Sequence, residues 1–457
     1  MKKQDIIAKT QSICPICQRP ADAYYYEKKG RVYISIECSK HEGIETLAAE
    51  NAEDFKRWTE SPVINIPPKV FLTKADAGGR SCPLNCGPCE NHLQTACCVL
   101  IDVTNRCNQH CPYCFARADE AGYVKEPALS EIEQKLDRLL LLGEDGREFN
   151  LQLSGGEPTV REDLPDIIAL ASRKGFRYIQ INSNGKRIAH EEGYARALRE
   201  AGASVIFMQF DGTRDDIYEE LRGEPLFETK LKAIRNCEDA GLAVTLVPTV
   251  VRGINDDNIG EMMEFLKDNV NVVKGIHFQP ASFFGRFPEG DQRNGRITMF
   301  GLLRKLQEQS PQFKISDSMP ISTGHPLCCF YSTYIKEPDG SIRCTLSKKA
   351  REDGLGCCSS LDLIKKDRDY VLNKWDVSAP KALGEEKYTS SLEITDLDEF
   401  LSYYRLNTFT VTGMAFMDGS NLDAERLKRC RVVQLTDDGR LIPFCAYNTI
   451  YREELNK

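Results

Sequence analysis

The feature that most constrains the fold is a regular alternation of short apolar runs with longer helical patterns, which begins near residue 98. Such alternation requires parallel strands joined by right-handed crossovers, and six units fit an incomplete barrel better than a closed eight-stranded one. The sequence therefore predicts an α/β fold with a partial (β/α)6 barrel. The expected strands are Val99–Val103, Asn150–Leu153, Tyr178–Asn182, Val205–Phe210, Ala243–Pro248 and Gly275–Gln279, and the expected helices lie near 128–142, 163–174, 190–201, 227–240, 257–268 and 298–310.

The 457 residues are too many for one ordinary domain, so smaller modules should flank the barrel. We predict a small Cys-rich N-terminal metal module over residues 1–70, of rubredoxin-like or zinc-knuckle type, and an auxiliary-cluster segment over 71–97. The barrel should span 98–314. Hairpin-like pieces after it predict a C-terminal auxiliary-cluster module over 315–457.

Composition excludes several classes of protein. The net charge is −8 with both signs interspersed, so we expect no nucleic-acid partner. No apolar run is long enough to cross a membrane and no signal peptide is evident, which predicts a cytoplasmic protein. Thiols stay reduced in that compartment, so the 19 cysteines are better explained by metal binding than by disulfides, and they suggest an anaerobic chemistry.

Three cysteines follow the first predicted strand on one tight loop, Cys107, Cys111 and Cys114. Three thiolates at this spacing can hold three irons of a [4Fe–4S] cluster and leave the fourth iron open for a substrate or cofactor. The C-terminal end of a barrel strand is where active sites lie. A zinc knuckle is the alternative, but structural zinc sites usually have four protein ligands.

Polar or glycine-rich segments also follow the next strands, although each could be an ordinary turn or strand end. They are Gly155-Gly156-Glu157-Pro158, Asn182-Ser183-Asn184, Gln209 with Asp211, and Val250 before the turn at Gly253. Adjacent glycines let a backbone approach a ligand closely, and the carboxylate and amides can accept or donate hydrogen bonds.

The cysteine loop resembles the CxxxCxφC signature of the radical S-adenosylmethionine (SAM) superfamily. The resemblance implies that SAM binds the open iron and is cleaved to a 5′-deoxyadenosyl radical. It also implies that Gly155, Gly156, Glu157 and Pro158 bind the amino group of SAM, that Asn182, Ser183, Asn184, Gln209 and Asp211 lie near its ribose or the substrate, and that Val250 packs on its adenine. The aromatic residues of the loop, Tyr113 and Phe115, join these predicted contacts.

A second CxxxCxxC run, Cys82, Cys86 and Cys89, precedes the first and can hold three irons of an auxiliary cluster. The neighbouring Cys97 or Cys98 could supply a fourth thiolate, and Cys98 is the predicted ligand. A zinc knuckle is again the alternative. At the N-terminus, a CxxC and a CxxH provide four tetrahedral ligands for one zinc or iron ion, namely Cys14, Cys17, Cys38 and His41.

Two further cysteine pairs flank turn signals near the C-terminus. Cys329 and Cys344 surround Pro338-Asp339-Gly340, and Cys430 and Cys445 surround Asp438-Gly439, so two hairpins could bring four thiolates together. Both resemble the hairpins of SPASM and twitch modules, which bind auxiliary clusters. Cys328, Cys357 and Cys358 compete for these roles, and any one of these thiols could instead be buried without a ligand.

The whole pattern resembles the archaeal tetraether lipid synthases and the related class D radical SAM methylases. The resemblance implies two auxiliary [4Fe–4S] clusters and hydrogen abstraction from an unactivated carbon, followed by a new C–C bond. The expected reaction is coupling of lipid tails, with peripheral contact to a membrane. The alternatives are methylation of a pterin or other small molecule with a folate-derived carbon, and a SPASM-type modification of a peptide. A reductant such as ferredoxin or flavodoxin is implied. A non-catalytic iron–sulfur carrier would leave the predicted SAM contacts unexplained.

Overall fold

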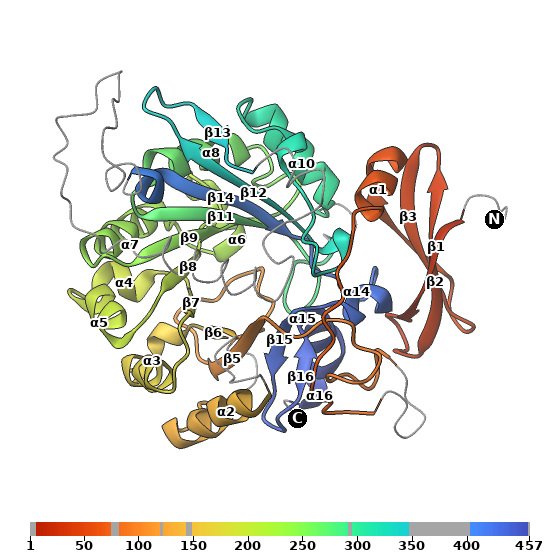
Figure 1. The fold of residues 1–457 in the computed structure, drawn as a ribbon, viewed down its shortest axis with the longest axis horizontal. Coiled ribbons are helices and arrows are strands. Elements are labelled where there is room, and N and C mark those ends of the chain that lie inside the picture. The colour runs from red at the N-terminus through yellow and green to blue at the C-terminus, as the bar shows by residue number, and fades with distance from the viewer. Residues whose placement is uncertain are drawn as a thin grey trace.

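A largely parallel sheet with helices on its outer side forms the centre of the protein (Figure 1). The computed structural model describes residues 6–74, 82–118, 122–142, 149–290, 295–346 and 403–455. Within these ranges, the six predicted strands pair in chain order, all parallel. The partial barrel predicted from the alternation is therefore confirmed.

The predicted strands and helices differ from the observed ones by a few residues at their ends. The strands are β5 (Cys98–Thr104), β6 (Asn150–Gly155), β7 (Ile179–Ser183), β8 (Val205–Gln209), β9 (Ala243–Val247) and β11 (Val273–Pro280), with the short β10 (Thr249–Val250) paired to β11. The helices are α2 (Leu129–Leu142), α3 (Leu164–Arg173), α4 (Lys186–His190), α5 (Tyr194–Ala201), α6 (Asp215–Arg222), α7 (Phe227–Asp239), α8 (Ile259–Asp268) and α10 (Met299–Gln309).

The two faces of the sheet differ in polarity. Alternate strand residues such as Val99, Ile101 and Leu153 are buried with the apolar sides of the helices in the main core. The residues between them face the other way, on what we call the inner face. Its half-buried members are mostly polar: Asp102, Gln152, Asn182, Phe207, Gln209, His277, Gln279 and Thr412.

Residues from the C-terminal part extend the same sheet at both edges. Beyond β11 lie β14 (Thr408–Met414), β12 (Cys329–Lys336) and β13 (Ile342–Cys344), and beyond β5 lie β15 (Val432–Leu435) and β16 (Leu441–Pro443). An open sheet leaves unpaired backbone groups at its edges, and these strands satisfy them. The strands after the predicted boundary at residue 314 thus share one sheet with the barrel strands.

The remaining C-terminal elements are short helices. They are the 3₁₀ turns η4 (Ile315–Asp317) and η5 (Pro326–Cys328), the helices α14 (Ala424–Lys428), α15 (Phe444–Ala446) and α16 (Arg452–Leu455), and the π-helix η6 (Tyr447–Tyr451). In Figure 1 the dark blue elements β15, β16, α14 and α15 lie between the barrel and the N-terminal sheet.

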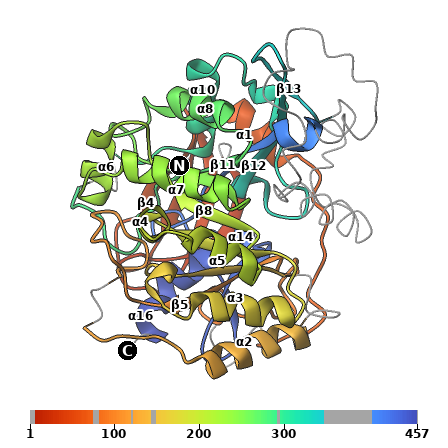
Figure 2. The same cartoon turned by 90° about the vertical axis from the view of Figure 1, so that its left-hand side faces the viewer.

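The N-terminal part is a four-stranded antiparallel sheet followed by one helix. Its elements are β1 (Ile6–Ile13), β2 (Pro20–Lys28), β3 (Arg31–Glu37), β4 (Ile44–Ala49) and α1 (Ala52–Thr59). This sheet packs on the rest of the molecule, because Val32 and Ile34, with Phe55 of α1, belong to the main core. In the view turned by 90° it lies behind the barrel (Figure 2). The Tyr25 hydroxyl donates to Asp423 at 2.9 Å, and Trp58 Nε1 donates to the Pro326 carbonyl at 2.7 Å. In the described parts of the chain, no helix is both long and apolar enough to span a membrane.

Candidate functional site

The loop with Cys107, Cys111 and Cys114 follows β5 at the C-terminal edge of the sheet, as predicted. Burial, together with the nearby Glu157 and the other two thiols, raises the pKa of Cys107 to about 12. All three cysteines are half-buried, and the thiols of Cys111 and Cys114 act electrostatically on that of Cys107. Three cysteines on one short loop fit a cluster with three cysteine ligands, because the thiolate form of cysteine is the metal ligand.

The last cysteine of the loop is fixed by the segment after β11. The backbone N–H of Cys114 donates to the Arg286 carbonyl at 2.9 Å, and the Arg286 N–H donates back at 2.8 Å. A Cβ on Gly285 would lie 2.4 Å from the Cys114 carbonyl oxygen, so only glycine allows this approach.

Gly155 and Gly156 hold the end of β6 against the start of the cysteine loop. A Cβ on Gly155 would lie 2.1 Å from the Thr104 oxygen, and one on Gly156 would lie 2.1 Å from the Arg106 oxygen. The Gly156 N–H donates to Thr104 at 2.8 Å. Pro158 then begins the buried 3₁₀ turn η3 (Pro158–Val160). The glycines thus bring their backbone next to the loop, where the predicted contact with SAM requires it.

Glu157 is predicted to contact the SAM amino group, and in the structure its carboxylate is held by neighbouring residues. Its carboxylate accepts hydrogen bonds from the backbone and hydroxyl of Thr159 at 3.1 and 2.7 Å, from Ser183 at 2.8 Å and from the Asn184 N–H at 2.6 Å. Burial raises the pKa of Glu157, and these hydrogen bonds act against that shift. Since its oxygens are occupied, Glu157 fastens β6 to β7 rather than presenting a free carboxylate.

Of the three polar residues at the end of β7, only Asn182 lies on the inner face, where its Oδ1 accepts from Gln180 at 2.8 Å. Ser183 is used by Glu157, and the Asn184 side chain donates to Asn108 in the cysteine loop at 2.8 Å. The side chains of Ser183 and Asn184 thus have partners within the protein, and their contact with ribose stays a prediction. Neighbouring residues of a strand point to opposite faces, which the motif alone did not resolve.

The Asp211 carboxylate likewise has its partner within the protein, because it is fully buried in an ion pair with Arg222. Two guanidinium nitrogens of Arg222 donate to its oxygens at 2.7 and 2.8 Å, and the third donates to the Tyr113 carbonyl at 2.9 Å. This arrangement links the end of β8 to the cysteine loop. Arg222 is a positioning residue whose role the sequence did not assign.

Lys230 was missed entirely by sequence reasoning. It lies on the buried side of α7, and its ammonium donates to the Asn184 carbonyl at 2.5 Å and to Gln209 Oε1 at 2.8 Å. Burial lowers the pKa of Lys230 to about 7. Gln209 Nε2 in turn donates to Asp211. The available signal was the helix pattern. Lys230 stands three and four residues before Ala233 and Ile234, at a position where this pattern places an apolar residue.

The predicted aromatic and adenine contacts lie in three different environments. Tyr113 is buried among Ile217, Leu221 and neighbouring apolar residues, where it anchors the loop. Phe115 is 38% exposed, with its ring 5.7 Å from that of Phe444. Val250 is fully buried in the main core, and its packing on adenine stays a prediction.

His277 occupies the centre of the inner face. Its Nδ1 lies 2.7 Å from the Thr412 hydroxyl, which donates onward to the Ile276 carbonyl, so Nδ1 carries the proton. The ring lies 5.7 Å from that of Phe207. Burial lowers the pKa of His277 to about 4, and the imidazole is therefore neutral at ordinary pH.

A separate cavity of about 230 Å³ lies where β5 and β6 meet the C-terminal elements. Gly155 and Gly156 line one side, and Asp102, Gln434 and Arg452 line others. Gln434 Oε1 and Arg452 Nη2 are buried without a hydrogen-bond partner in the described parts of the chain. The cavity thus offers one acceptor and one donor beside the glycines.

The second cysteine run encloses a different and much smaller space. Cys82, Cys86 and Cys89 line a cavity of about 20 Å³ together with His92 and Lys428. The predicted fourth ligand, Cys98, lies elsewhere: burial and the nearby Cys97 and Cys430 raise its pKa, and it packs with Leu100 and Phe444. Cys98 is the first residue of β5 and does not line this cavity, and its role as the fourth ligand stays a prediction.

The C-terminal cysteines gather, but not in the predicted set. Cys344 pairs with Tyr334 in the β12–β13 hairpin, whereas Cys329 pairs with Met414 at the opposite end of β12. The hairpin therefore separates Cys329 from Cys344 instead of joining them. Cys357 and Cys358 lie outside the described residues.

Cys430 and Cys445, at the base of the β15–β16 hairpin, do come together. Burial and the nearby thiols of Cys445 and Cys328 raise the pKa of Cys430. Cys97 is close as well, since its N–H donates to the Arg431 carbonyl at 3.0 Å. Arg426 Nε lies 3.5 Å from Cys328 Sγ and supplies a positive charge to the group.

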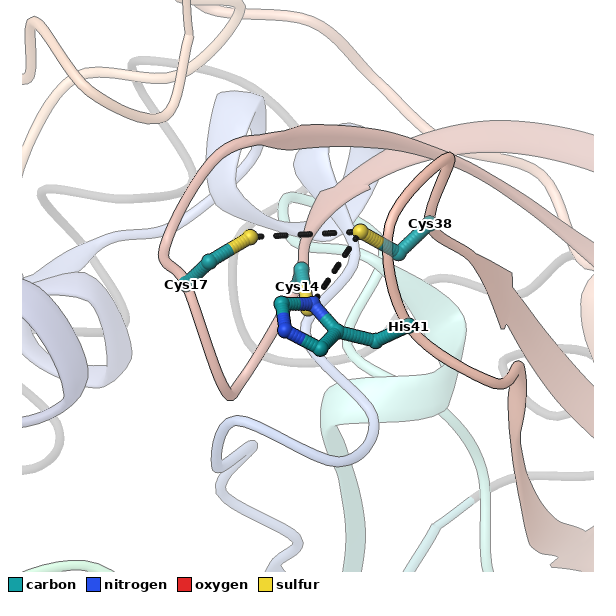
Figure 3. A group of neighbouring side chains, drawn as sticks. All are labelled: Cys14, Cys17, Cys38 and His41. Atoms are coloured by element: carbon teal, nitrogen blue, oxygen red, sulfur yellow. Dashed lines mark hydrogen bonds between the residues drawn. The ribbon is translucent and has the colours of Figure 1, made fainter.

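The N-terminal ligand set is fully assembled (Figure 3). The ligand atoms of Cys14, Cys17, Cys38 and His41 all lie within 4.8 Å of one another, as a single tetrahedral ion requires. His41 Nδ1 lies 3.5 Å from Cys14 Sγ and 3.6 Å from Cys38 Sγ. The pKa of Cys38 is lowered to about 6, first by a hydrogen bond from the Lys40 N–H and then by one with the His41 side chain. A lower pKa favours the thiolate that a metal needs.

Comparison with known proteins agrees with this geometry. Residues 101–266 match the model of the radical SAM superfamily, and residues 6–50 match that of the HMPTM N-terminal zinc ribbon domain. The chain belongs to the radical SAM superfamily, which implies SAM and a [4Fe–4S] cluster. It is an enzyme of that superfamily with a zinc-ribbon module at its N-terminus.

One relative is similar over almost its full length: the 7,8-dihydro-6-hydroxymethylpterin dimethyltransferase of Methanocaldococcus jannaschii is 32% identical, across 98% of this chain and 95% of that protein. The Fe-coproporphyrin III synthase of Methanosarcina barkeri is 34% identical, but across only 36% of this chain and 38% of that one. The structure of Streptococcus suis SuiB bound to precursor peptide SuiA has a TM-score of 0.39 at 16% identity, covering 48% of this chain and 46% of that one.

Proposed function

We propose that this protein is a radical SAM methylase that acts on a reduced pterin, with 7,8-dihydro-6-hydroxymethylpterin as the first candidate substrate. The observation that carries the proposal is the end-to-end similarity to a dimethyltransferase named for that pterin. Pterin methylation was the alternative expectation from the sequence, and it now takes precedence over coupling of lipid tails.

The chemistry of the inner face supports a polar, planar substrate. Gln152, Asn182 and Gln279 carry amides on this face, and an amide can donate and accept in one plane, which suits the donor and acceptor edge of a pterin ring. The Gln209 amide lies beside them but is held by Lys230 and Asp211. Phe207 offers an aromatic face beside them. A binding site for lipid tails would instead bury apolar side chains at these positions.

The residues of the chain would act as follows. A [4Fe–4S] cluster on Cys107, Cys111 and Cys114 would supply the electron that cleaves SAM to the 5′-deoxyadenosyl radical. Gly155 and Gly156 bring backbone groups to the methionine end of SAM. The inner-face amides orient the pterin so that the carbon to be methylated faces the radical, and neutral His277 can accept a hydrogen bond through Nε2 without adding charge.

The cavity of about 230 Å³ beside Gly155 and Gly156 is the place we assign to the carbon donor, a folate-derived one-carbon carrier. Its unpartnered Gln434 Oε1 and Arg452 Nη2 would be satisfied by a neighbouring N–H and C=O of such a molecule.

We also propose auxiliary iron–sulfur clusters at two sites. One is the Cys82 run, and the other is formed by Cys97, Cys328, Cys430 and Cys445, which replaces the predicted set of Cys329, Cys344, Cys430 and Cys445. Electrons would come from a ferredoxin or flavodoxin. We assign zinc to the N-terminal site, because four ligand atoms around one ion suit a closed structural site.

The test is an anaerobic reaction of the reconstituted full chain with SAM, dithionite, a reduced folate carrying a labelled one-carbon unit, and the dihydropterin. We expect 5′-deoxyadenosine and a pterin with one or two labelled methyl groups by mass spectrometry. The variant with Cys107, Cys111 and Cys114 changed to Ala is the matched control. If deuterium reaches 5′-deoxyadenosine from a labelled lipid and never from the labelled pterin, lipid coupling replaces this proposal.

A further inference from the structure

His92 lies beside the cysteine run that lacks a fourth ligand. It lines the same cavity of about 20 Å³ as Cys82, Cys86 and Cys89, and is only 8% exposed. Together they read C-x3-C-x2-C-x2-H in the sequence. Thiolates and imidazole are both iron ligands in iron–sulfur proteins, since histidines replace cysteines on one iron of Rieske centres.

Hydrogen bonds fix the backbone at both ends of the cysteine run, which turns back after Cys89. The His92 N–H donates to the Cys89 carbonyl at 2.9 Å, which closes a turn and brings the ring to the side of the thiols. Tyr451 fixes the other end of the run, because its hydroxyl accepts from the Cys86 N–H and donates to the Pro83 carbonyl, both at 2.8 Å. His92 is thus placed by a structured loop.

The tautomer of His92 follows from its one hydrogen bond. Nε2 lies 3.1 Å from the carbonyl oxygen of Cys430, and a carbonyl only accepts, so Nε2 carries the proton. Nδ1 is then left with its lone pair. Metal-binding histidines are commonly held this way, with one ring nitrogen donating to a backbone carbonyl while the other binds the metal.

The rival ligands are placed elsewhere. Cys98 lies near Cys430 and Gln152, and Cys97 near Arg431, while neither lines the cavity of the run. A single ion is also disfavoured: within the described ranges, the ligand atoms of this run do not converge within 4.8 Å of one another as those of the N-terminal set do. Cys82 and Cys86 are hydrogen-bonded to each other, and Cys89 and His92 line the same cavity beside them.

We propose that His92 Nδ1 is the fourth protein ligand of an iron–sulfur cluster held by Cys82, Cys86 and Cys89. All four irons would then be bound by the protein. No iron would be open to substrate, and the cluster would serve in electron transfer. The neutral imidazole replaces an anionic thiolate, which lowers the negative charge of the site and raises its potential. The assignment does not depend on the pterin substrate.

The experiment uses the full chain labelled with ¹⁵N-histidine, reconstituted and reduced anaerobically, in a background where Cys107, Cys111 and Cys114 are Ala. Pulsed EPR should show a strongly coupled histidine nitrogen that is lost in H92A and retained in H325A, a buried histidine near the C-terminal cysteines. In H92C, iron and sulfide per chain should equal the parent value while the nitrogen coupling disappears, which separates loss of a ligand from loss of folding. A reduced parent protein without strongly coupled histidine nitrogen, or a coupling that persists in H92A or H92C, would overturn the assignment.

Discussion

The two CxxxCxxC-type loops have nearly the same spacing of thiols but very different surroundings. The Cys107 loop lies at the edge of the sheet and is braced from several strands by Arg222, Asn184 and the segment at Arg286. The Cys82 loop packs against the C-terminal helices and has His92 beside it. We infer that the neighbours of a cluster loop, and not its cysteines, decide whether the fourth iron stays open for chemistry.

The largest expected effect separates the functions of the two loops. Changing Cys107, Cys111 and Cys114 to Ala should abolish formation of 5′-deoxyadenosine from SAM, because the open iron is lost. Changing Cys82, Cys86 and Cys89 to Ala should leave SAM cleavage measurable in a dithionite assay by chromatography. SAM cleavage that survives the first change and vanishes with the second would reverse the assignments.

The second prediction concerns the brace under the first loop. R222M leaves the Asp211 carboxylate buried without its partner, which typically costs about 3–5 kcal/mol in the free energy of unfolding. Denaturant unfolding of the anaerobic protein measures this loss. The double variant R222M/D211N should recover part of it, since the uncompensated charge is removed, and no recovery would mean that the ion pair is not what stabilises the loop.

A third prediction addresses the second loop. Y451F removes the hydroxyl that accepts from the Cys86 N–H and donates to the Pro83 carbonyl, at a cost of about 1–3 kcal/mol for the groups left unsatisfied. We expect less iron per chain after reconstitution and an unchanged rate of SAM cleavage in a dithionite assay. A lower rate with full iron content would tie Tyr451 to the radical site instead.

The smallest effect is a pH dependence from Lys230, whose pKa is about 7 in the folded protein. Between that pH and the ordinary lysine pKa, the unfolded chain binds the proton that the folded chain has released, so the contribution of Lys230 to stability rises with pH and is constant below pH 7. We expect the free energy of unfolding of the wild type to increase from pH 7 to pH 9 relative to that of K230M, as measured by denaturant unfolding at both pH values. The control K232M changes an exposed residue of α7, and its free energy of unfolding should depend on pH as that of the wild type does. An equal pH dependence for the wild type and K230M would contradict the lowered pKa of Lys230.

The sequence was sufficient for the barrel because strand and helix periodicities are local. The six predicted strands from Val99 to Gln279 are all present. It did not predict the four-stranded N-terminal sheet, where the metal ligands were recognised but the pairing of β1 to β4 was not. It also did not show that β14 and β15 would complete the sheet edges, since such pairing joins residues that are distant in the chain.

The site was predictable at the level of its cysteines and glycines, and less so at the level of individual side chains. Ser183, Asn184, Glu157 and Asp211 lie where the motifs place them, but their polar atoms bind other parts of the protein. Whether a side chain faces a ligand or a neighbouring strand is set by packing, which a motif does not contain. Lys230 was missed for the same reason, because its partners come from β7 and β8.

The contrast between the two loops is tested most directly by EPR of the reduced protein with and without SAM. When Cys82, Cys86 and Cys89 are Ala, addition of SAM should shift the remaining cluster signal, because the Cys107 loop offers an open iron. When Cys107, Cys111 and Cys114 are Ala, SAM should leave the signal unchanged. A SAM-dependent shift in this second variant would contradict the account.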